Sequence, residues 1–394
     1  MTPWTGPTLE VHADHLRTPD QTLLPFELKW LRLDSLQACE QALREMQVRG
    51  APLIGAVAAF GLAFGLREGK ALPVACERLA ATRPTAVNLR WALDEVSRVL
   101  SRTESALSTA EGKQSAPASV LSTAASARNP AAGGDAFTRA WQRACEIAAD
   151  DARINAAIGH HGLALLRERM ALRQTLGRPV APGAPLQLLT HCNAGRLATV
   201  DHGTALAPVY AAHAAGIPVH VWVDETRPRN QGASLTAWEL MQAGVPCTVV
   251  ADNAGGWLMQ QGRVDAVIVG CDRVAANGDV VNKIGTLLKA LAAREAGLPF
   301  WVACPTPTLD LTLPEGALIP IEMRDARELT HARVRLPDGA VVQAELMDAA
   351  VSALNPAFDL TPARLVDALI TEHGAVPASQ AGLLGLNSRS SSSQ

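Results

Sequence analysis

The second half of the chain repeats one pattern, in which a short apolar run is followed by a stretch with helical periodicity. The apolar runs lie at 186–190, 218–223, 247–251, 266–270 and 300–304. The helical stretches between them lie at 203–215, 234–243, 255–261 and 282–296. Most runs lack polar alternation, so both faces of each strand must be buried. The pattern predicts an α/β fold with a mostly parallel sheet and helices on both faces.

The first half has a different rhythm. Helical patterns lie at 36–48, 77–82, 89–100 and 136–172, with short extended pieces near the start. The uncharged stretch 50–66 is too short for a comfortable membrane span, and it is rich in Gly and Ala. It predicts a buried, closely packed helix. We therefore expect a smaller, mainly helical N-terminal domain at 1–180 and the sheet domain at 181–378.

Two segments are predicted to remain unstructured. From about 101 to 135 the chain consists largely of Ser, Ala, Gly and Pro with few large apolar side chains, which predicts a flexible surface loop. The C-terminal segment 379–394 ends in a low-complexity serine run and is predicted to be a disordered tail.

Composition argues against nucleic-acid and membrane binding and indicates the cellular compartment. The net charge of −3 gives no strong positive field that would attract nucleic acid or an anionic membrane. The N-terminus lacks the basic and apolar regions of a secretory signal, and the seven cysteines form no CxxC pair. An odd cysteine number without such pairs fits a reducing cytosol better than a disulfide scaffold or a zinc site. We expect a cytoplasmic protein.

Candidate reactive residues follow two of the predicted strands, because ligands in such sheets bind beyond the carboxyl ends of the strands. Cys192 follows the first strand in a Gly-containing loop, where nearby peptide N–H groups can favour a thiolate. The alternative is a buried structural cysteine. Asp272 follows the fourth strand, and it can cap a helix, pair with Arg273 or perform acid–base chemistry.

Several cationic residues are candidates for a phosphate site. Arg49 precedes an apolar helix with free peptide donors, Arg83 lies at a turn, and Lys283 lies at a predicted helix start. Lys283 is also compatible with an ordinary surface lysine, and the sequence does not show that the three residues converge. No GxGxxG follows a strand and no GxxxxGK[ST] is present, so nucleotide binding of those types loses support. The adjacent pair His160 and His161 does not face one ligand on a helix, which argues against a metal site there.

Seven motifs, read in order, resemble the methylthioribose-1-phosphate isomerase family. They are RGAPLIG, RPTAVN, HCNAGRLAT, DHGTALAP, ETRPRNQGASLTAWEL, GCDRVAANGDVVNKIGT and NPAFDLTP. The likeness extends from about Arg49 to about Phe358. Ribose 1,5-bisphosphate isomerases and regulatory subunits of the eukaryotic initiation-factor exchange complex share this fold, so the resemblance implies a Rossmann-like sheet domain, a helical N-terminal domain and a homodimer.

The resemblance also implies residue roles and a reaction. It makes Cys192 and Asp272 the catalytic pair, and it assigns substrate contact to Arg49, Gly50, Ala51, Arg83, Gln231, Asn282 and Lys283. The implied reaction converts 5-methylthioribose 1-phosphate into its ketose in methionine salvage, without a metal or organic cofactor. The apolar methylthio end needs an apolar wall, which we expect in the N-terminal half.

Two alternatives remain open at this point. One is an isomerase of a related sugar phosphate, such as 5-deoxyribose 1-phosphate or ribose 1,5-bisphosphate. The other is a non-catalytic regulatory subunit that binds a sugar phosphate or nucleotide, for which Cys192 and Asp272 would be dispensable.

Overall fold

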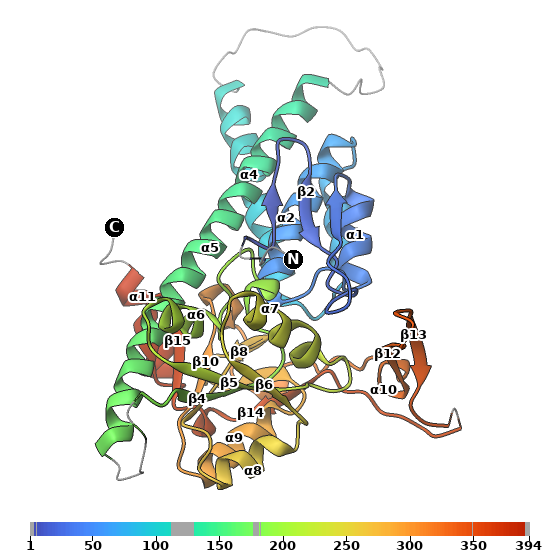
Figure 1. The fold of residues 1–394 in the computed structure, drawn as a ribbon. Helices are drawn as coiled ribbons and strands as arrows, with labels where there is room; N and C mark the ends of the chain where they lie inside the picture. Colours follow the sequence, from blue (N-terminus) through green and yellow to red (C-terminus); the bar gives the residue numbers. More distant parts are fainter. Residues whose placement is uncertain are drawn as a thin grey trace, which may run out of the picture.

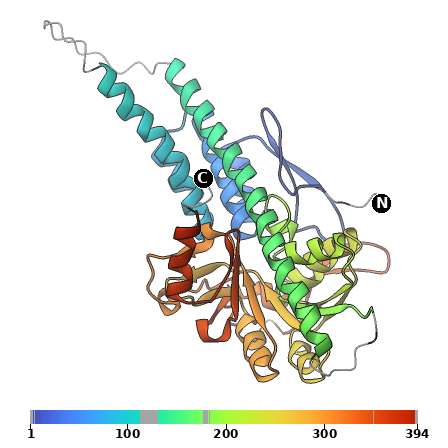
Figure 2. The same ribbon diagram turned by 90° about the vertical axis from the view of Figure 1, so that its left-hand side faces the viewer.

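The computed structural model describes residue 4 and residues 6–111, 130–175, 181, 183–348 and 350–390 (Figure 1). A mainly helical N-terminal part lies above a part built on a large sheet, and one long helix runs along both (Figures 1 and 2).

The large sheet has seven strands in the order β16-β15-β10-β7-β4-β5-β6. Its strands are β4 (Leu186–Thr190), β5 (Val219–Asp224), β6 (Cys247–Val250), β7 (Ala266–Val269), β10 (Phe300–Ala303), β15 (Ala368–Thr371) and β16 (Gly374–Val376). All neighbours are parallel except β15 and β16. The predicted strands are confirmed within about one residue. Chain order reverses between β4 and β7, and such a reversal is where α/β sheets bind ligands.

Helices cover both faces of this sheet. They include α6 (Ala207–Ala214), α7 (Ala237–Gln242), α8 (Ala254–Gln260) and α9 (Thr286–Glu295). Along β7, Val267 and Val269 pack in a core with α8 and α9, while Ala266 and Ile268 pack in the opposite core with α6 and α7. Both faces are therefore buried, which explains why the strands are continuously apolar.

The N-terminal part has its own core. A three-stranded antiparallel sheet of β1 (Glu10–Val11), β2 (Leu16–Pro19) and β3 (Trp30–Leu33) precedes α1 (Leu36–Arg44), α2 (Ala51–Arg67), α3 (Leu72–Ala80) and α4 (Val87–Glu111). Helix α2 is the predicted apolar helix, and it is buried along nearly its whole length. Gly61 and Gly65 on α2 lie directly against Cys39 and Ala75, so small residues allow this close packing. Among the described residues, no helix is long and apolar enough to cross a membrane.

Helix α5 (Pro130–Thr175) joins the two parts (Figure 2). Ala144 and Ile147 pack in the N-terminal core, whereas Ile158 and Leu166 pack in a core of the large sheet. Because one helix contributes to both cores, the boundary near residue 180 remains a prediction.

A smaller sheet and a hairpin complete the chain. The smaller sheet has four strands in the order β11 (Leu309–Asp310), β8 (Arg273–Ala275), β9 (Val280–Lys283) and β14 (Phe358–Thr361). The hairpin of β12 (His331–Arg335) and β13 (Val341–Glu345) follows the short helix α10 (Arg327–Thr330) and projects from the body of the molecule (Figure 1).

Three sequence predictions need correction. The predicted helix 282–296 begins only at Thr286, because residues 280–283 form β9 and pair with β14. The predicted loop at 101–135 is wrong at both ends, since α4 continues to Glu111 and α5 begins at Pro130. Residues 112–129, the rest of that prediction, lie outside the described part. The predicted disordered tail forms helix α11 (Gln380–Ser390) as far as Ser390, because Leu383 and Leu386 pack in the sheet core.

Candidate active site

One pocket lies where the N-terminus of α2 faces the strand ends of the large sheet and the smaller sheet. Every residue proposed from the sequence lines it, namely Arg49, Gly50, Ala51, Arg83, Cys192, Gln231, Asp272, Asn282 and Lys283. Cys192 and Asp272 follow β4 and β7, which are neighbours in the sheet. The thiol and the carboxyl therefore share one cavity although eighty positions separate them in the sequence.

The backbone at Cys192 is held in an uncommon conformation. Its φ is 67°, a value that non-glycine residues seldom adopt and that persists only when the surroundings enforce it. The Cys192 N–H donates to Thr226 Oγ1 at 2.8 Å, and the Cys192 carbonyl accepts from Thr236 Oγ1 at 2.7 Å. These bonds fix both sides of the residue, which is only 9% exposed.

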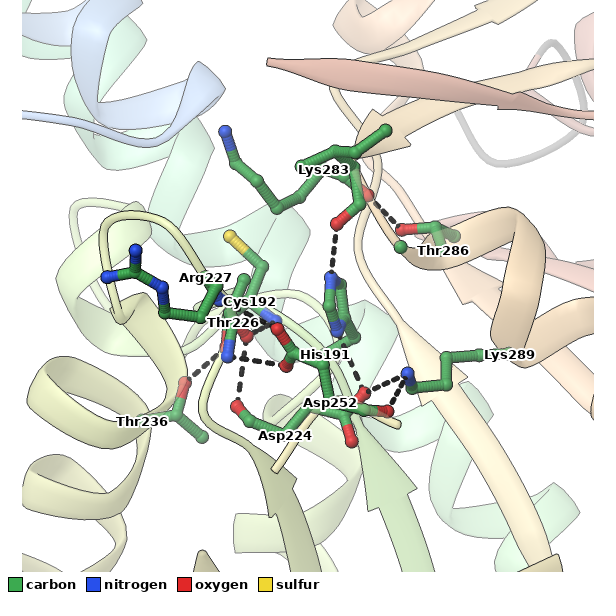
Figure 3. A network of polar contacts seen from close by, with 12 residues as sticks. His191, Cys192, Asp224, Thr226, Arg227, Thr236, Asp252, Lys283, Thr286 and Lys289 are labelled. Atoms are coloured by element: carbon green, nitrogen blue, oxygen red, sulfur yellow. Dashed lines mark hydrogen bonds and ion pairs between the residues drawn. The ribbon is translucent and has the colours of Figure 1, made fainter. Parts of the chain in front are cut away.

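A buried network of charged groups supports this loop (Figure 3). The ring nitrogens of His191 lie 2.8 Å from Asp224 Oδ2 and 2.7 Å from the carbonyl oxygen of Ile284. Lys289 Nζ lies 3.2 Å from the same Asp224 oxygen. His191 thereby links the loop that carries Cys192 to the chain just after Lys283. The Cys192 and Lys283 side chains reach the same side of the network (Figure 3).

Asp272 lies at the carboxyl end of β7 and lines the pocket. Its N–H donates to Val281 O at 3.0 Å, which ties it to the smaller sheet. Burial raises the pKa of the Asp272 carboxyl, and the charges of Lys283, Arg49 and Arg83 oppose that rise. A carboxyl with a raised pKa is suited to act as a proton donor near neutral pH.

Arg83 has donors that lack partners. Its Nε and Nη1 atoms are buried without a hydrogen-bond partner among the described residues, and its Nη2 lies 3.9 Å from Glu322 Oε2. Burial lowers the pKa of the Arg83 guanidinium. Unpaired donors on a buried cation are costly unless an anionic ligand completes them. This observation points to an anion in the pocket.

The N-terminus of α2 adds further positive potential. Gly50 is the N-cap with a φ of 92°, and a Cβ there would lie 2.3 Å from Ala198 O, so only glycine fits. Free peptide N–H groups and the helix dipole at such a terminus attract phosphate. Arg49 immediately precedes it and donates from both Nη atoms to Asn193.

Lys283 and Asn282 reach the pocket from β9 rather than from a helix start. Lys283 Nζ donates to Ala357 O at 3.0 Å and lies 4.9 Å from the centre of the Phe358 ring. Burial lowers the pKa of the Lys283 ammonium, while Cys192 and Asp272 favour its charged form. Gln231, placed just before a π-helical turn (Gly232–Thr236), has a buried Oε1 with no partner in the described structure.

Sequence reasoning missed some lining residues. Arg229 lies in the polar segment that follows β5, another strand end, but neither the strand-end rule nor the resemblance selected it. Arg324 gave no signal, because it lies in an irregular segment far along the chain. The apolar lining was expected from the N-terminal half, yet it comes from both halves: Met46, Ile54, Ile319, Pro320 and Phe358.

One cluster has the composition of a metal site. Ligand atoms of His191, Asp224 and Asp252 lie within 4.8 Å of one another. The Lys289 ammonium already contacts Asp224 and donates to the carbonyl of Asp252, while the Asp252 carboxylate accepts from the N–H groups of Thr226 and Arg227. Because Lys289 supplies the positive charge, this arrangement suits a structural ion-pair network better than a metal ion.

Comparison with known proteins places the chain among its relatives. A model of the initiation factor 2 subunit family matches residues 47–378. A methylthioribose-1-phosphate isomerase from Dechloromonas aromatica is 51% identical over 384 residues, which covers 96% of this chain and 96% of that protein. A second, from Rhodospirillum rubrum, is 51% identical over 371 residues and covers 93% and 87%.

Solved structures give the same picture. The 5-methylthioribose 1-phosphate isomerase from Pyrococcus horikoshii OT3 matches with a TM-score of 0.74 and 34% identity, covering 98% of each chain. The translation initiation factor eIF-2B subunit delta from A. fulgidus matches with a TM-score of 0.73 and 32% identity, covering 97% of this chain and 99% of its own. Both overlap this chain almost completely.

Proposed function

The chain belongs to the initiation factor 2 subunit family, and we propose that within it the chain is the aldose–ketose isomerase that converts 5-methylthioribose 1-phosphate into 5-methylthioribulose 1-phosphate. Relatives of about half identical sequence carry that name along nearly the whole chain. The observation that carries the proposal is the pocket, where the Cys192 thiol lies near the Asp272 carboxyl, whose pKa burial raises, and near Arg83, a buried cation with two unpaired donors.

The cationic groups suit the substrate's phosphate. Arg83 has guanidinium donors without partners, and Arg49 has guanidinium donors beyond the two that bind Asn193. The N-terminus of α2 adds peptide N–H groups. Guanidinium donors and helix termini are common phosphate ligands. We assign the phosphate to these groups, and Gln231, Asn282 and Lys283 to the sugar.

Asp272 and Cys192 are assigned the proton transfers. The phosphate blocks the anomeric oxygen, so the ring oxygen must be protonated before the ring opens. Protonated Asp272 is suited to donate that proton, because burial favours its neutral form. Hydrogen then moves from C2 to C1. Either Cys192 removes the C2 proton through an enediol, or the hydrogen moves as hydride while both groups handle only oxygen-bound protons.

The two routes give different isotope patterns. In D2O, an enediol route places solvent deuterium at C1, whereas a direct hydride shift retains the original hydrogen. Proton NMR of the product distinguishes them.

A non-catalytic regulatory role is the second candidate, because the structural match to an initiation-factor subunit is as good as the match to an isomerase. That role predicts binding without turnover. The test is proton NMR of the purified protein with 5-methylthioribose 1-phosphate and no added cofactor: appearance of the ketose supports the isomerase, and binding without conversion contradicts it. Rates with 5-deoxyribose 1-phosphate and ribose 1,5-bisphosphate then define the substrate range.

The cellular setting is part of the same proposal. We place the enzyme in methionine salvage, in the cytoplasm, as a homodimer that needs no cofactor and no nucleic-acid partner. Size-exclusion chromatography with light scattering tests the dimer.

A further inference from the structure

A buried carboxylate lies behind the pocket, under the loop that carries Cys192. Glu239 on α7 is 2% exposed and does not belong to the pocket lining. Its Oε1 accepts from Asn193 Nδ2, and its Oε2 accepts from the N–H of Leu197 at 3.3 Å. A Cβ on Gly195 would lie 1.8 Å from Glu239 Oε1, so the loop closes directly over this carboxylate. Glu239 therefore cannot touch a ligand in the pocket.

Glu239 determines which way the Asn193 amide faces. Thr236 Oγ1 donates to the carbonyl of Cys192 at 2.7 Å, so it receives Asn193 Nδ2 as an acceptor at 3.1 Å. A carboxylate can only accept, and the Asn193 amide has two donor hydrogens on one side. With both hydrogens directed to Glu239 and Thr236, Asn193 Oδ1 must face the opposite way.

The oxygen of that amide holds Arg49. One Nη of Arg49 donates to Asn193 Oδ1, and the other donates to the carbonyl of Asn193 at 2.7 Å. These two hydrogen bonds fix one edge of the guanidinium. Its remaining donors are available to a ligand in the pocket, which Arg49 and Gly50 both line. The buried negative charge of Glu239 and the positive charge of Arg49 are thus connected through a single amide.

We propose that Glu239 is a positioning residue of this site, which acts through Asn193 to fix Arg49 for phosphate binding and to hold the Cys192 loop. The inference rests on the proposed function only for its kinetic readout. Burial raises the pKa of the Glu239 carboxyl to about 7, with the Asn193 bond and the Arg49 charge opposing the rise.

Substitutions at the two positions separate positioning from mere packing. In Glu239→Gln, one amide hydrogen must face either Asn193 Nδ2 or the Leu197 N–H, so one donor loses its acceptor. In Asn193→Asp, two carboxylates meet. In the double variant, the amide introduced at position 239 can donate to the carboxylate introduced at position 193 and still accept from Leu197. That carboxylate can in turn accept from Arg49, so the double variant restores the connection from Leu197 to Arg49 that either single change breaks.

The experiment measures the dissociation constant of inorganic phosphate by calorimetry, and KM and kcat for 5-methylthioribose 1-phosphate, in wild type, both single variants and the double variant. Circular dichroism melts report folding. Asp151→Asn is the matched control, because Asp151 is also a buried carboxylate that accepts from the same loop, at Val200 N at 2.7 Å, without touching Asn193.

We expect Glu239→Gln and Asn193→Asp each to raise the phosphate dissociation constant and KM at least about tenfold, with kcat falling less, as expected for loss of a charge-assisted contact. The double variant should return within about threefold of wild type, and Asp151→Asn should remain within about twofold. Unchanged phosphate binding in Glu239→Gln, or a double variant as weak as the product of the single effects, would overturn the inference. A wild type that binds phosphate but turns over no substrate would contradict the proposed function alone.

Discussion

Replacing Arg83 by methionine should change stability and substrate binding in opposite directions. The Arg83 side chain is buried, its Nε and Nη1 have no partner in the described structure, and its nearest carboxylate oxygen, on Glu322, lies 3.9 Å away. Glu322 is already engaged by Arg324 at 2.8 Å and by Thr85 at 3.0 Å. The free protein thus carries an incompletely paired buried cation.

The magnitudes follow from the two unpaired donors. Each unsatisfied buried donor costs about 1–3 kcal/mol, so Arg83→Met should raise the free energy of unfolding of the ligand-free protein by about 1–3 kcal/mol in total, after loss of some packing. The same change removes two charge-assisted bonds to phosphate. At about 1–2 kcal/mol net for each bond, KM should rise about 30- to 1,000-fold.

The assay pairs urea unfolding without ligand with initial rates for 5-methylthioribose 1-phosphate. Arg173→Met is the control, because Arg173 is similarly buried but is paired through its Nη1 with Pro185 O at 2.7 Å and with Asp265 Oδ2 at 3.0 Å. It should lose about 3–5 kcal/mol of stability and keep its KM. The reasoning is refuted if Arg83→Met is destabilised as Arg173→Met is and its KM stays within about threefold of wild type.

Three other predictions concern the catalytic pair, a buried acid and the glycine N-cap. Asp272→Asn and Cys192→Ser should each lower kcat at least about a hundredfold with an unchanged far-UV spectrum; near-normal rates would remove the assigned role. Burial raises the pKa of Asp151 from 3.8 to about 7, so between these values the folded chain retains a proton that the unfolded chain releases. The free energy of unfolding should therefore fall as the pH rises from about 4 to 7, and it should fall less in Asp151→Asn. Urea midpoints of both proteins at about pH 5 and 7.5 measure this difference. Gly50→Ala should cost at least about 2 kcal/mol of unfolding free energy, because the new Cβ meets Ala198 O; a melting temperature equal to wild type would contradict this.

The sequence was most informative where a local pattern corresponds to a local structure. Continuous apolar runs bounded by Gly, Pro or polar residues predicted five of the seven strands of the large sheet, all but β15 and β16, because burial on both faces removes polar alternation. The strand-end rule then identified Cys192 and Asp272 as candidates, because each follows a predicted strand of the sheet. These inferences need no knowledge of distant contacts.

The errors arose where pairing partners lie far apart in the sequence. Asn282 and Lys283 begin the predicted helical stretch 282–296, but they pair with Asp359 and Phe358 in β14, which no local periodicity reveals. The tail looked disordered because its serines outnumber the leucines that anchor α11 in the core. Arg324 was not predicted, because it lies in an irregular segment and reaches the pocket only through contacts that are distant in the sequence. The convergence of the nine proposed residues was implied by the resemblance, and composition and spacing could not show it.

The position of the pocket explains how the protein tolerates its surplus of cations. Arg49, Arg83 and Lys283 line the same cavity, and without a ligand their repulsion and burial oppose folding. Two large cores flank the cavity, and α5 is packed into both, so separating the charges would require disrupting a core. The folded protein therefore retains this repulsion, and binding of a dianion relieves it. The same charges thus both destabilise the empty site and give it affinity for phosphate.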